Sequence, residues 1–294
     1  MTAFHPFHPS PRRPSMPPPP NTCDSQFHVL GDPAIYPTRP GAAYQMQSAT
    51  WERAKHVHDQ LGISRGIIVQ TTTYGGDHSA VLDALKALGP NYKGCANALV
   101  FAEKDAAYVE MLNANRINGA RFSFRQALGA VLDDAAFKAA VGKLADMGWY
   151  MKVQPEETGI AADIGKLDGI DIPILIDHMG RPDASKGVNC ESIVALKRLM
   201  DRGNVWVMLS LGEKITRTGP PYDDVVPLAQ ELVAHAPERC VWASDWPHPV
   251  SRQAPPNDAD LLELFYRYVP EEATRKQILV DNPARLFGFD RAEG

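Results

Sequence analysis

The sequence lacks the features that mark several large functional classes. Acidic side chains outnumber basic ones, 35 against 30, so no excess of positive charge is available to bind a nucleic-acid backbone. No continuous apolar run approaches the ~20 residues that a membrane-spanning helix needs. The segment 29-VLGDPAIYP-37, after the first predicted strand, lacks the G-x-G-x-x-G pattern of a dinucleotide-binding turn. We therefore expect no nucleic-acid partner, no membrane and no cofactor.

Cysteine is scarce and scattered. The four cysteines show no C-x-x-C spacing, and three lie in apolar strand-like runs, which favours buried reduced thiols. The first 20 residues contain no continuous apolar segment, so they predict no signal peptide, and a cytoplasmic location is expected. Their high proline content predicts an extended, largely solvated arm over residues 1–20, which could pack on the body or on a neighbouring subunit. The oligomeric state stays open.

Apolar runs alternate with helical patterns through the remaining residues, 21–294. The predicted strands are 24–29, 66–73, 94–101, 119–124, 149–154, 172–180, 204–210 and 239–246. The predicted helices are 49–63, 77–89, 104–115, 133–148, about 158–168, 190–203 and 223–236. Eight apolar strands separated by helices, in about 230 residues, fit a closed (β/α)8 TIM barrel in a single domain. An open doubly wound sheet is the alternative.

Reactive side chains gather at the carboxyl ends of these strands, the face that builds the active site of a barrel. They are Gln26, His28, Tyr74, Arg121, Gln154, His178, Ser210 and Asp245. The run 174-ILIDHMGRPD-183 includes His178, and 241-VWASDWPHPV-250 includes Asp245 with His248 close by. Packing alone rarely needs such groups on a buried strand, although a rim histidine and a capping aspartate are the alternatives.

These motifs resemble a known family. The first-strand run DSQFH, the runs DHMGRPD and SDWPHP, and the late 280-VDNPARLFGF-289 are similar to the amidohydrolase superfamily, from about residue 22 to 288. Within it, the chain most resembles the branch that includes 2-pyrone-4,6-dicarboxylate lactonase and D-galactarolactone isomerase. The superfamily has a (β/α)8 fold, in agreement with the strand count.

The resemblance implies a metal centre whose ligands are only partly present. Metal-dependent members carry two histidines on the first strand, Lys or Glu on the fourth, histidines on the fifth and sixth, and Asp on the eighth. Here Gln26, Arg121 and Gln154 depart from that set, while His178 and Asp245 match it. Three surviving ligands could hold zinc in principle, but an amide is a poor zinc ligand and the adjacent Arg121 repels a cation, so the sequence predicts a site without metal.

A second H-x-H spacing, 56-HVH-58, lies inside a helical pattern. Positions two apart on a helix point in different directions. We expect this pair to be a surface feature.

Cationic and phenolic side chains near the strand ends predict an anionic substrate, because guanidinium binds carboxylate in a bidentate way. A small carboxylate-bearing lactone is expected, and the resemblance implies that cations at matching positions bind its carboxylates. The predicted substrate-binding residues are Gln26, Tyr44, Tyr74, Arg121, Ser123, Arg125, Gln154 and Lys214. Arg125 could equally be a surface residue of the loop that follows the fourth strand. Arg181 is predicted to be structural, paired with Asp183 or a backbone carbonyl.

The predicted catalytic residues are Asp245, His178, His28 and His248. An amide at Gln26 removes a titratable group, which should harm activation of water more than polarisation of a carbonyl. The resemblance therefore favours isomerisation of D-galactaro-1,5-lactone to the 1,4-lactone, in which the substrate's 4-hydroxyl is a tethered nucleophile. Asp245 would carry the proton, and His28 and His178 would stabilise the oxyanion. His248 would orient Asp245 or donate a proton.

Two alternatives remain at this point. The first is a metal-independent lactonase that hydrolyses a dicarboxylate lactone such as 2-pyrone-4,6-dicarboxylate. The second is a ligand-binding barrel that has lost catalysis.

Overall fold

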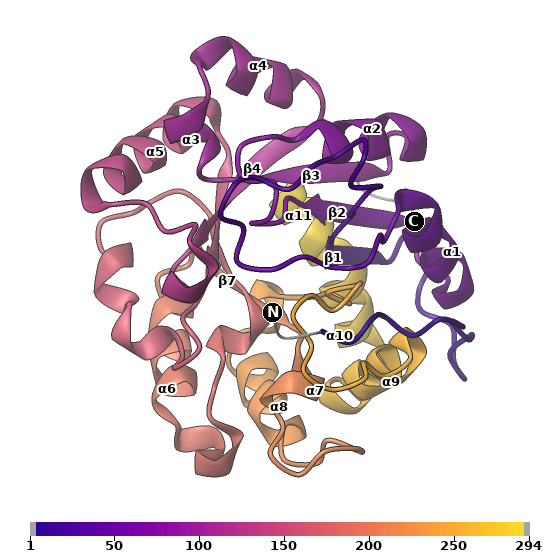
Figure 1. The fold of residues 1–294 in the computed structure, drawn as a ribbon. Helices are drawn as coiled ribbons and strands as arrows, with labels where there is room; N and C mark the ends of the chain where they lie inside the picture. The colour runs from indigo at the N-terminus through magenta and orange to yellow at the C-terminus, as the bar shows by residue number, and fades with distance from the viewer. Residues whose placement is uncertain (1–3, 291–294) are drawn as a thin grey trace.

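The computed structural model describes residues 4–290 and shows a barrel of parallel strands with helices around it (Figure 1). The strands are β1 (Cys23–Phe27), β2 (Arg65–Val69), β3 (Tyr92–Asn97), β4 (Ile117–Ser123), β5 (Tyr150–Gln154), β6 (Ile174–Ile176), β7 (Val205–Leu209) and β8 (Cys240–Trp242). They are hydrogen-bonded in chain order from β1 to β8. The predicted (β/α)8 barrel is confirmed.

Helices connect and cap these strands. They are α1 (Trp51–Leu61), α2 (Ser79–Leu88), α3 (Val100–Glu103), α4 (Ala106–Ala114), α5 (Asp134–Met147), α6 (Glu191–Met200), α7 (Gly212–Ile215), α8 (Val226–His235), α9 (Asp258–Tyr268), α10 (Glu272–Lys276) and α11 (Asn282–Phe287). Within residues 4–290, no helix is long and apolar enough to cross a membrane. The four cysteines are buried and free, as predicted.

The predicted helix 158–168 is wrong. Two short 3₁₀ helices, Ile160–Ala162 and Ile164–Leu167, stand there instead. Gly165 lies in the middle of this segment, and glycine costs about 1 kcal/mol relative to alanine inside a helix, so a continuous α-helix is disfavoured.

The strands that carry the most informative motifs end earlier than predicted. β6 stops at Ile176 and β8 stops at Trp242, so His178 and Asp245 lie in the turns that follow. Both residues have positive φ values, 56° and 61°, which are uncommon for residues with a side chain. These sharp turns set the direction in which the imidazole and the carboxylate leave the barrel wall.

The barrel closes between β1 and the segment after β8. The His28 N–H donates to the Trp246 carbonyl at 2.7 Å, and the Asp245 N–H donates to the Gln26 carbonyl at 3.0 Å. Closure therefore places Gln26 and His28 beside Asp245, although more than 200 residues of chain separate them.

A buried carboxylate reinforces this closure. Asp24 accepts the Ser244 N–H at 3.0 Å and also the Ser244 hydroxyl. The Nε2 atom of His58 lies 3.2 Å from the same carboxylate, and His58 is 1% exposed. His56 is exposed, but the prediction of a surface feature is wrong for His58, because α1 turns it toward the buried acid.

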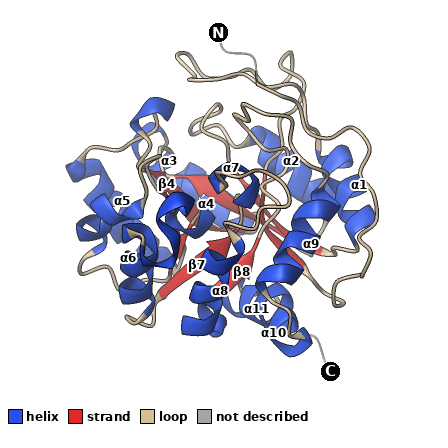
Figure 2. Cartoon of the chain, turned by 90° about the horizontal axis from the view of Figure 1, so that it is seen from below, coloured by secondary structure: helices blue, strands red, loops and turns tan. Residues whose placement is uncertain are grey.

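The two ends of the barrel differ. Apolar side chains fill the interior, and α11 closes the end where the strands begin, with the Phe287 ring 5.2 Å from the Tyr150 ring. The loops that follow the strands lie at the opposite end, together with the N-terminal segment (Figure 2). Within residues 4–290, the cavity described below is lined by loops at this second end.

Candidate active site

A cavity of about 600 Å³ opens among the loops that follow the strands. Eight of the predicted site residues line it: His28, Tyr44, Arg121, Arg125, Gln154, His178, Lys214 and Asp245. The other four predicted residues are buried behind its surface: Gln26, Tyr74, Ser123 and His248. The structure thus divides the predicted set into groups that a ligand can touch and groups that support them.

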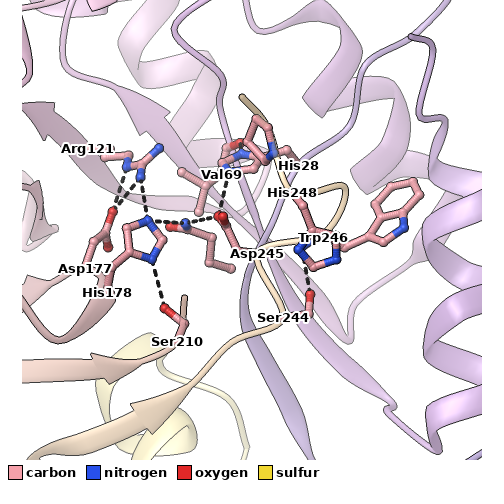
Figure 3. A network of polar contacts seen from close by, with 12 residues as sticks. His28, Val69, Arg121, Asp177, His178, Ser210, Ser244, Asp245, Trp246 and His248 are labelled. Carbon is pink, nitrogen blue, oxygen red and sulfur yellow. Dashed lines mark hydrogen bonds and ion pairs between the residues drawn. The ribbon is translucent and has the colours of Figure 1, made fainter. Parts of the chain in front are cut away.

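Gln26 links the two groups that the sequence singled out. Its Nε2 atom lies 2.7 Å from Oδ1 of Asp245 and 3.5 Å from Nε2 of His178. Asp245 and His178, the two residues that it joins, are labelled in Figure 3. An amide nitrogen carries two hydrogens, so it can donate to both acceptors at once. A neutral imidazole has a single N–H and could not do so. Gln26 therefore fixes the Asp245 carboxylate and the His178 imidazole relative to each other.

His28 is fixed by a backbone acceptor. Its Nδ1 atom lies 2.6 Å from the Val69 carbonyl oxygen, which can only accept, so Nδ1 carries a proton. The Nε2 atom then lies 3.4 Å from Oδ1 of Asp245. His28 can donate to that carboxylate, or to a ligand, only when Nε2 is protonated as well.

His178 is a neutral imidazole in this site. Burial is the main reason that the pKa of His178 falls to about 3, while Asp245 and Asp177 oppose the fall and Arg121 adds to it. Since Nε2 of His178 faces the Gln26 amide and lies 3.5 Å from Nη2 of Arg121, it is the acceptor. The Nδ1–H then donates to the Ser210 hydroxyl at 2.9 Å.

Asp245 is ionised. Burial alone would raise the pKa of Asp245, but attraction by His178 and Lys214 and the hydrogen bond with His28 hold it well below its usual range. His178 attracts only when it is protonated, so Lys214, at 3.5 Å from Oδ2, supplies the permanent positive charge. The cavity therefore contains a fixed anion beside a neutral imidazole.

A buried ion cluster beneath the cavity was not anticipated. Asp177 is fully buried and lies 2.7 Å from Nη2 of Arg121 and 2.8 Å from Nζ of Lys152. Two cations and one carboxylate leave the cluster a net charge of +1. A lysine inside the apolar strand 149-WYMKVQ-154 was the signal in the sequence, because a buried lysine needs an acidic partner.

His248 belongs to a second buried cluster. Its Nε2 atom lies 3.0 Å from Oδ1 of Asp258, and its Nδ1 atom lies 3.8 Å from Oε1 of Glu213. Burial would lower the pKa of His248, but these two carboxylates outweigh it and raise the pKa to about 9. The backbone N–H of His248 donates to the Asp245 carbonyl at 2.7 Å. The side chain is therefore a charged clamp that supports the turn of Asp245.

The outer wall of the cavity carries further cations. Arg125 and Arg181 both approach Glu157, at 2.8 and 3.4 Å, and the Nε–H of each is buried without a hydrogen-bond partner within the described residues. The predicted pairing of Arg181 with Asp183 is wrong, because Asp183 pairs with Arg217 at 3.4 Å. Arg181 lines the cavity, a placement that the sequence did not reveal.

The remaining predicted residues take different places. The Tyr74 hydroxyl accepts the Gly31 N–H at 3.1 Å, and the Ser123 hydroxyl accepts the Arg125 N–H at 3.3 Å, so both serve the backbone. Gln154 lines the cavity with a buried Oε1 that has no partner among residues 4–290. Tyr44 also lines it, and burial is the main cause that raises the pKa of its phenol, which therefore stays neutral.

The retained ligand set does not fit a divalent metal. In the part of the chain that the structure describes, no three His, Cys, Asp or Glu side chains converge as ligands. Nε2 of His178 faces donors from Gln26 and Arg121, and the Asp245 carboxylate faces Gln26 and Lys214. N–H donors, two of them cationic, thus point at the atoms that would have to bind the metal.

Comparison with known proteins places this geometry in context. Residues 23–289 match the family described as Amidohydrolase. The chain is 35% identical over 277 residues to a 4-sulfomuconolactone hydrolase of Hydrogenophaga intermedia, covering 92% of this chain and 89% of that protein. It is 30% identical over 287 residues to a 2-pyrone-4,6-dicarboxylate hydrolase of Comamonas testosteroni, covering 95% and 93%. It is 31% identical over 275 residues to a D-galactarolactone isomerase of Agrobacterium fabrum, covering 90% of each.

Proposed function

The chain belongs to the amidohydrolase family, and from that premise we propose that it is an enzyme that transfers the acyl group of a small lactone carrying at least two anionic groups. One observation supports this most directly: the cavity combines an ionised Asp245 with cationic side chains around its wall. The three relatives compared above are all named for action on lactones.

Two net-positive clusters support a substrate with two anionic groups. Arg121 belongs to the cluster with Lys152 and Asp177, and Arg125 belongs to the cluster with Arg181 and Glu157. Each cluster contains two cations and one carboxylate, so each keeps one positive charge. Arg125 and Arg181 line the cavity, so their guanidinium groups can donate to a carboxylate or sulfonate of the ligand.

Asp245 is assigned the proton transfer. A nucleophilic hydroxyl adds to the lactone carbonyl, its proton passes to the Asp245 carboxylate, and the tetrahedral intermediate then expels the ring oxygen, which takes that proton. Arg121 and Lys214 are the cationic donors beside the reacting region and are suited to the oxyanion. The predicted oxyanion role of His28 and His178 would require a proton on each Nε2 atom.

The nucleophile distinguishes two versions of this proposal. Gln26 favours isomerisation, because it takes the place of a titratable group, and the low pKa of Asp245 makes it a weak base. A hydroxyl tethered within the substrate tolerates a weak base better than free water does, since its effective molarity is high. D-galactaro-1,5-lactone converted to the 1,4-lactone is the corresponding reaction.

Hydrolysis is the second version, and the names of two relatives, at 35% and 30% identity, favour it. In that case water occupies the position of the tethered hydroxyl, and a dicarboxylate such as 2-pyrone-4,6-dicarboxylate is opened to an acid. Asp245 again receives the proton. The two versions share the cavity and differ only in the source of the attacking oxygen.

A proton NMR time course of chelator-treated protein tests the proposal. D-galactaro-1,5-lactone and 2-pyrone-4,6-dicarboxylate are supplied separately, each with a no-enzyme control and with a parallel sample that contains added zinc. Accelerated 1,4-lactone supports isomerisation, and accelerated ring-opened acid supports hydrolysis. No acceleration with either lactone would count against lactone chemistry on these substrates, and activity only with zinc would count against a metal-independent site.

A further inference from the structure

The N-terminal arm crosses the loop that carries Asp245. We call residues 243–257, between β8 and α9, the β8–α9 loop. The Phe7 ring lies 5.0 Å from the Trp246 ring, and Trp246 directly follows Asp245 in the chain. Arg53 covers Phe7 at 5.5 Å, and Phe7 is only 7% exposed. One aromatic side chain of the arm is thus inserted between α1 and this loop.

Backbone contacts bind the arm along the same loop. The His5 N–H donates to the Ser251 carbonyl at 3.0 Å. Asn257 accepts the Arg12 N–H at 3.2 Å and donates to the Ser10 carbonyl at 2.8 Å. Asn257 also caps α9 through its side-chain oxygen, so the arm is connected to both the middle and the end of the loop.

A charged contact anchors the arm to α9. Arg12 lies 2.5 Å from Asp260 and 2.6 Å from Glu263, and the Ser15 N–H donates to Glu263 at 2.7 Å. The hydrogen bond from Arg12 is the largest of the effects that lower the pKa of Glu263 to about 2. The neighbouring Arg13 is exposed and makes no side-chain contact of this kind in the described part of the chain.

The arm also reaches the cavity itself. Phe4 lines the cavity and packs edge-on against Tyr44, with ring centroids 6.3 Å apart. Residues 249–256 of the β8–α9 loop line the same cavity. The arm and the loop therefore form one continuous part of its wall.

We propose that residues 4–16 are a strap that positions the β8–α9 loop and completes the ligand cavity, with Phe7 and Arg12 as positioning residues and Phe4 as a wall residue. The identification of this cavity as an active site rests on the function proposed above, but the strap itself does not. Because Trp246 adjoins Asp245, a loosened strap would widen the range of positions open to that carboxylate. The extended conformation predicted for the arm is thus compatible with a fixed place on the body.

Hydrogen exchange measured by mass spectrometry on full-length protein tests the strap without any substrate. We expect peptides from the β8–α9 loop to exchange about tenfold faster in Phe7→Ala, because a protecting contact is lost. Arg12→Ala should show a smaller increase, and Arg13→Ala is the matched control that should behave as the parent protein. Equal exchange in all four proteins would overturn the proposal.

Citrate binding, measured by calorimetry, supplies the second readout. Citrate is a small polyanion that the cationic cavity should hold, and we expect Phe4→Ala and Phe7→Ala to bind it about three to tenfold more weakly. If Phe7→Ala does not fold, Phe7→Leu and Arg12→Ala take its place. Citrate affinity that is unchanged in Phe4→Ala and in the strap variants would contradict the wall assignment. Absence of citrate binding by the parent protein would instead contradict the proposed anionic ligand, while the exchange data would still decide on the strap.

Discussion

The ends of β6 and β8 each present a buried histidine, and the two histidines differ in charge. His178, after β6, is 4% exposed and has a pKa lowered to about 3, so it is neutral at physiological pH. His248, after β8, is 0% exposed and has a pKa raised to about 9, so it is an imidazolium. Burial lowers the pKa of both rings, so it accounts for the neutral His178 but not for the charged His248.

The partners make the difference. The Gln26 amide and the Arg121 guanidinium lie 3.5 Å from Nε2 of His178, and neither group stabilises a positive charge on the ring. Two carboxylates, Asp258 and Glu213, flank His248 and stabilise a positive charge on its ring. The β6 end can therefore meet a polar ligand with a neutral ring, whereas the β8 end uses its charged ring to support the turn that carries Asp245.

The largest expected effect comes from removing the anion at the β8 end. We expect Asp245→Asn to lower kcat by about 10³-fold, in the range of general acid–base catalysis, because the amide cannot take up the proton. Steady-state turnover of whichever lactone is active provides the measurement. Asp171→Asn, at an exposed carboxylate before β6, is the control that should keep full activity. Unchanged turnover in Asp245→Asn would refute the assigned role.

The fold was largely predictable because its pattern is repeated. Each parallel strand is apolar along its length, so all eight strands were located from the sequence, with errors mainly at their ends. The exceptions are local. Gly165 disrupts a segment that otherwise has helical periodicity, and no helix was predicted after residue 236, so α9, α10 and α11 were missed.

The site was predicted most directly where a residue marks the end of a strand. His178 and Asp245 follow apolar strands directly, and barrel topology brings such positions together. The partners of these residues come from distant segments: Lys152 with Asp177, and Glu213 with His248. Sequence spacing contains no information about such pairs, and the same applies to the contact between Phe7 and Trp246.

The next effect tests the clamp at the β8 end. Replacing His248 with glutamine leaves Asp258 and Glu213 buried without a positive charge, so we expect unfolding free energy to fall by about 3 to 5 kcal/mol. Chemical denaturation measures this loss. His56→Gln, on the exposed side of α1, should change stability by less than about 0.5 kcal/mol. A similar loss of stability in both variants would mean that pairing with Asp258 and Glu213 gives His248 no special contribution to stability.

The smallest expected effect is the pH dependence of stability, which should differ between His248 and His178. The pKa of His248 rises on folding from its usual 6.5 to about 9, so its contribution is complete below pH 6.5 and is lost as the pH rises through 9. The loss should be on the order of 3 kcal/mol. His178 has the opposite dependence: its pKa falls to about 3, so its contribution is present above pH 6.5 and is lost as the pH falls toward 3.

Denaturation of the parent protein and of His248→Gln, repeated from pH 6 to pH 10, isolates the contribution of His248 to stability. Other groups titrate in both proteins and cancel in the difference, so the stability gap should be widest near pH 6 and should narrow as the pH passes 9. A gap that stays constant across this range would show that His248 is not charged in the folded protein. The contrast between the β6 and β8 ends would then have to come from Asp245 alone.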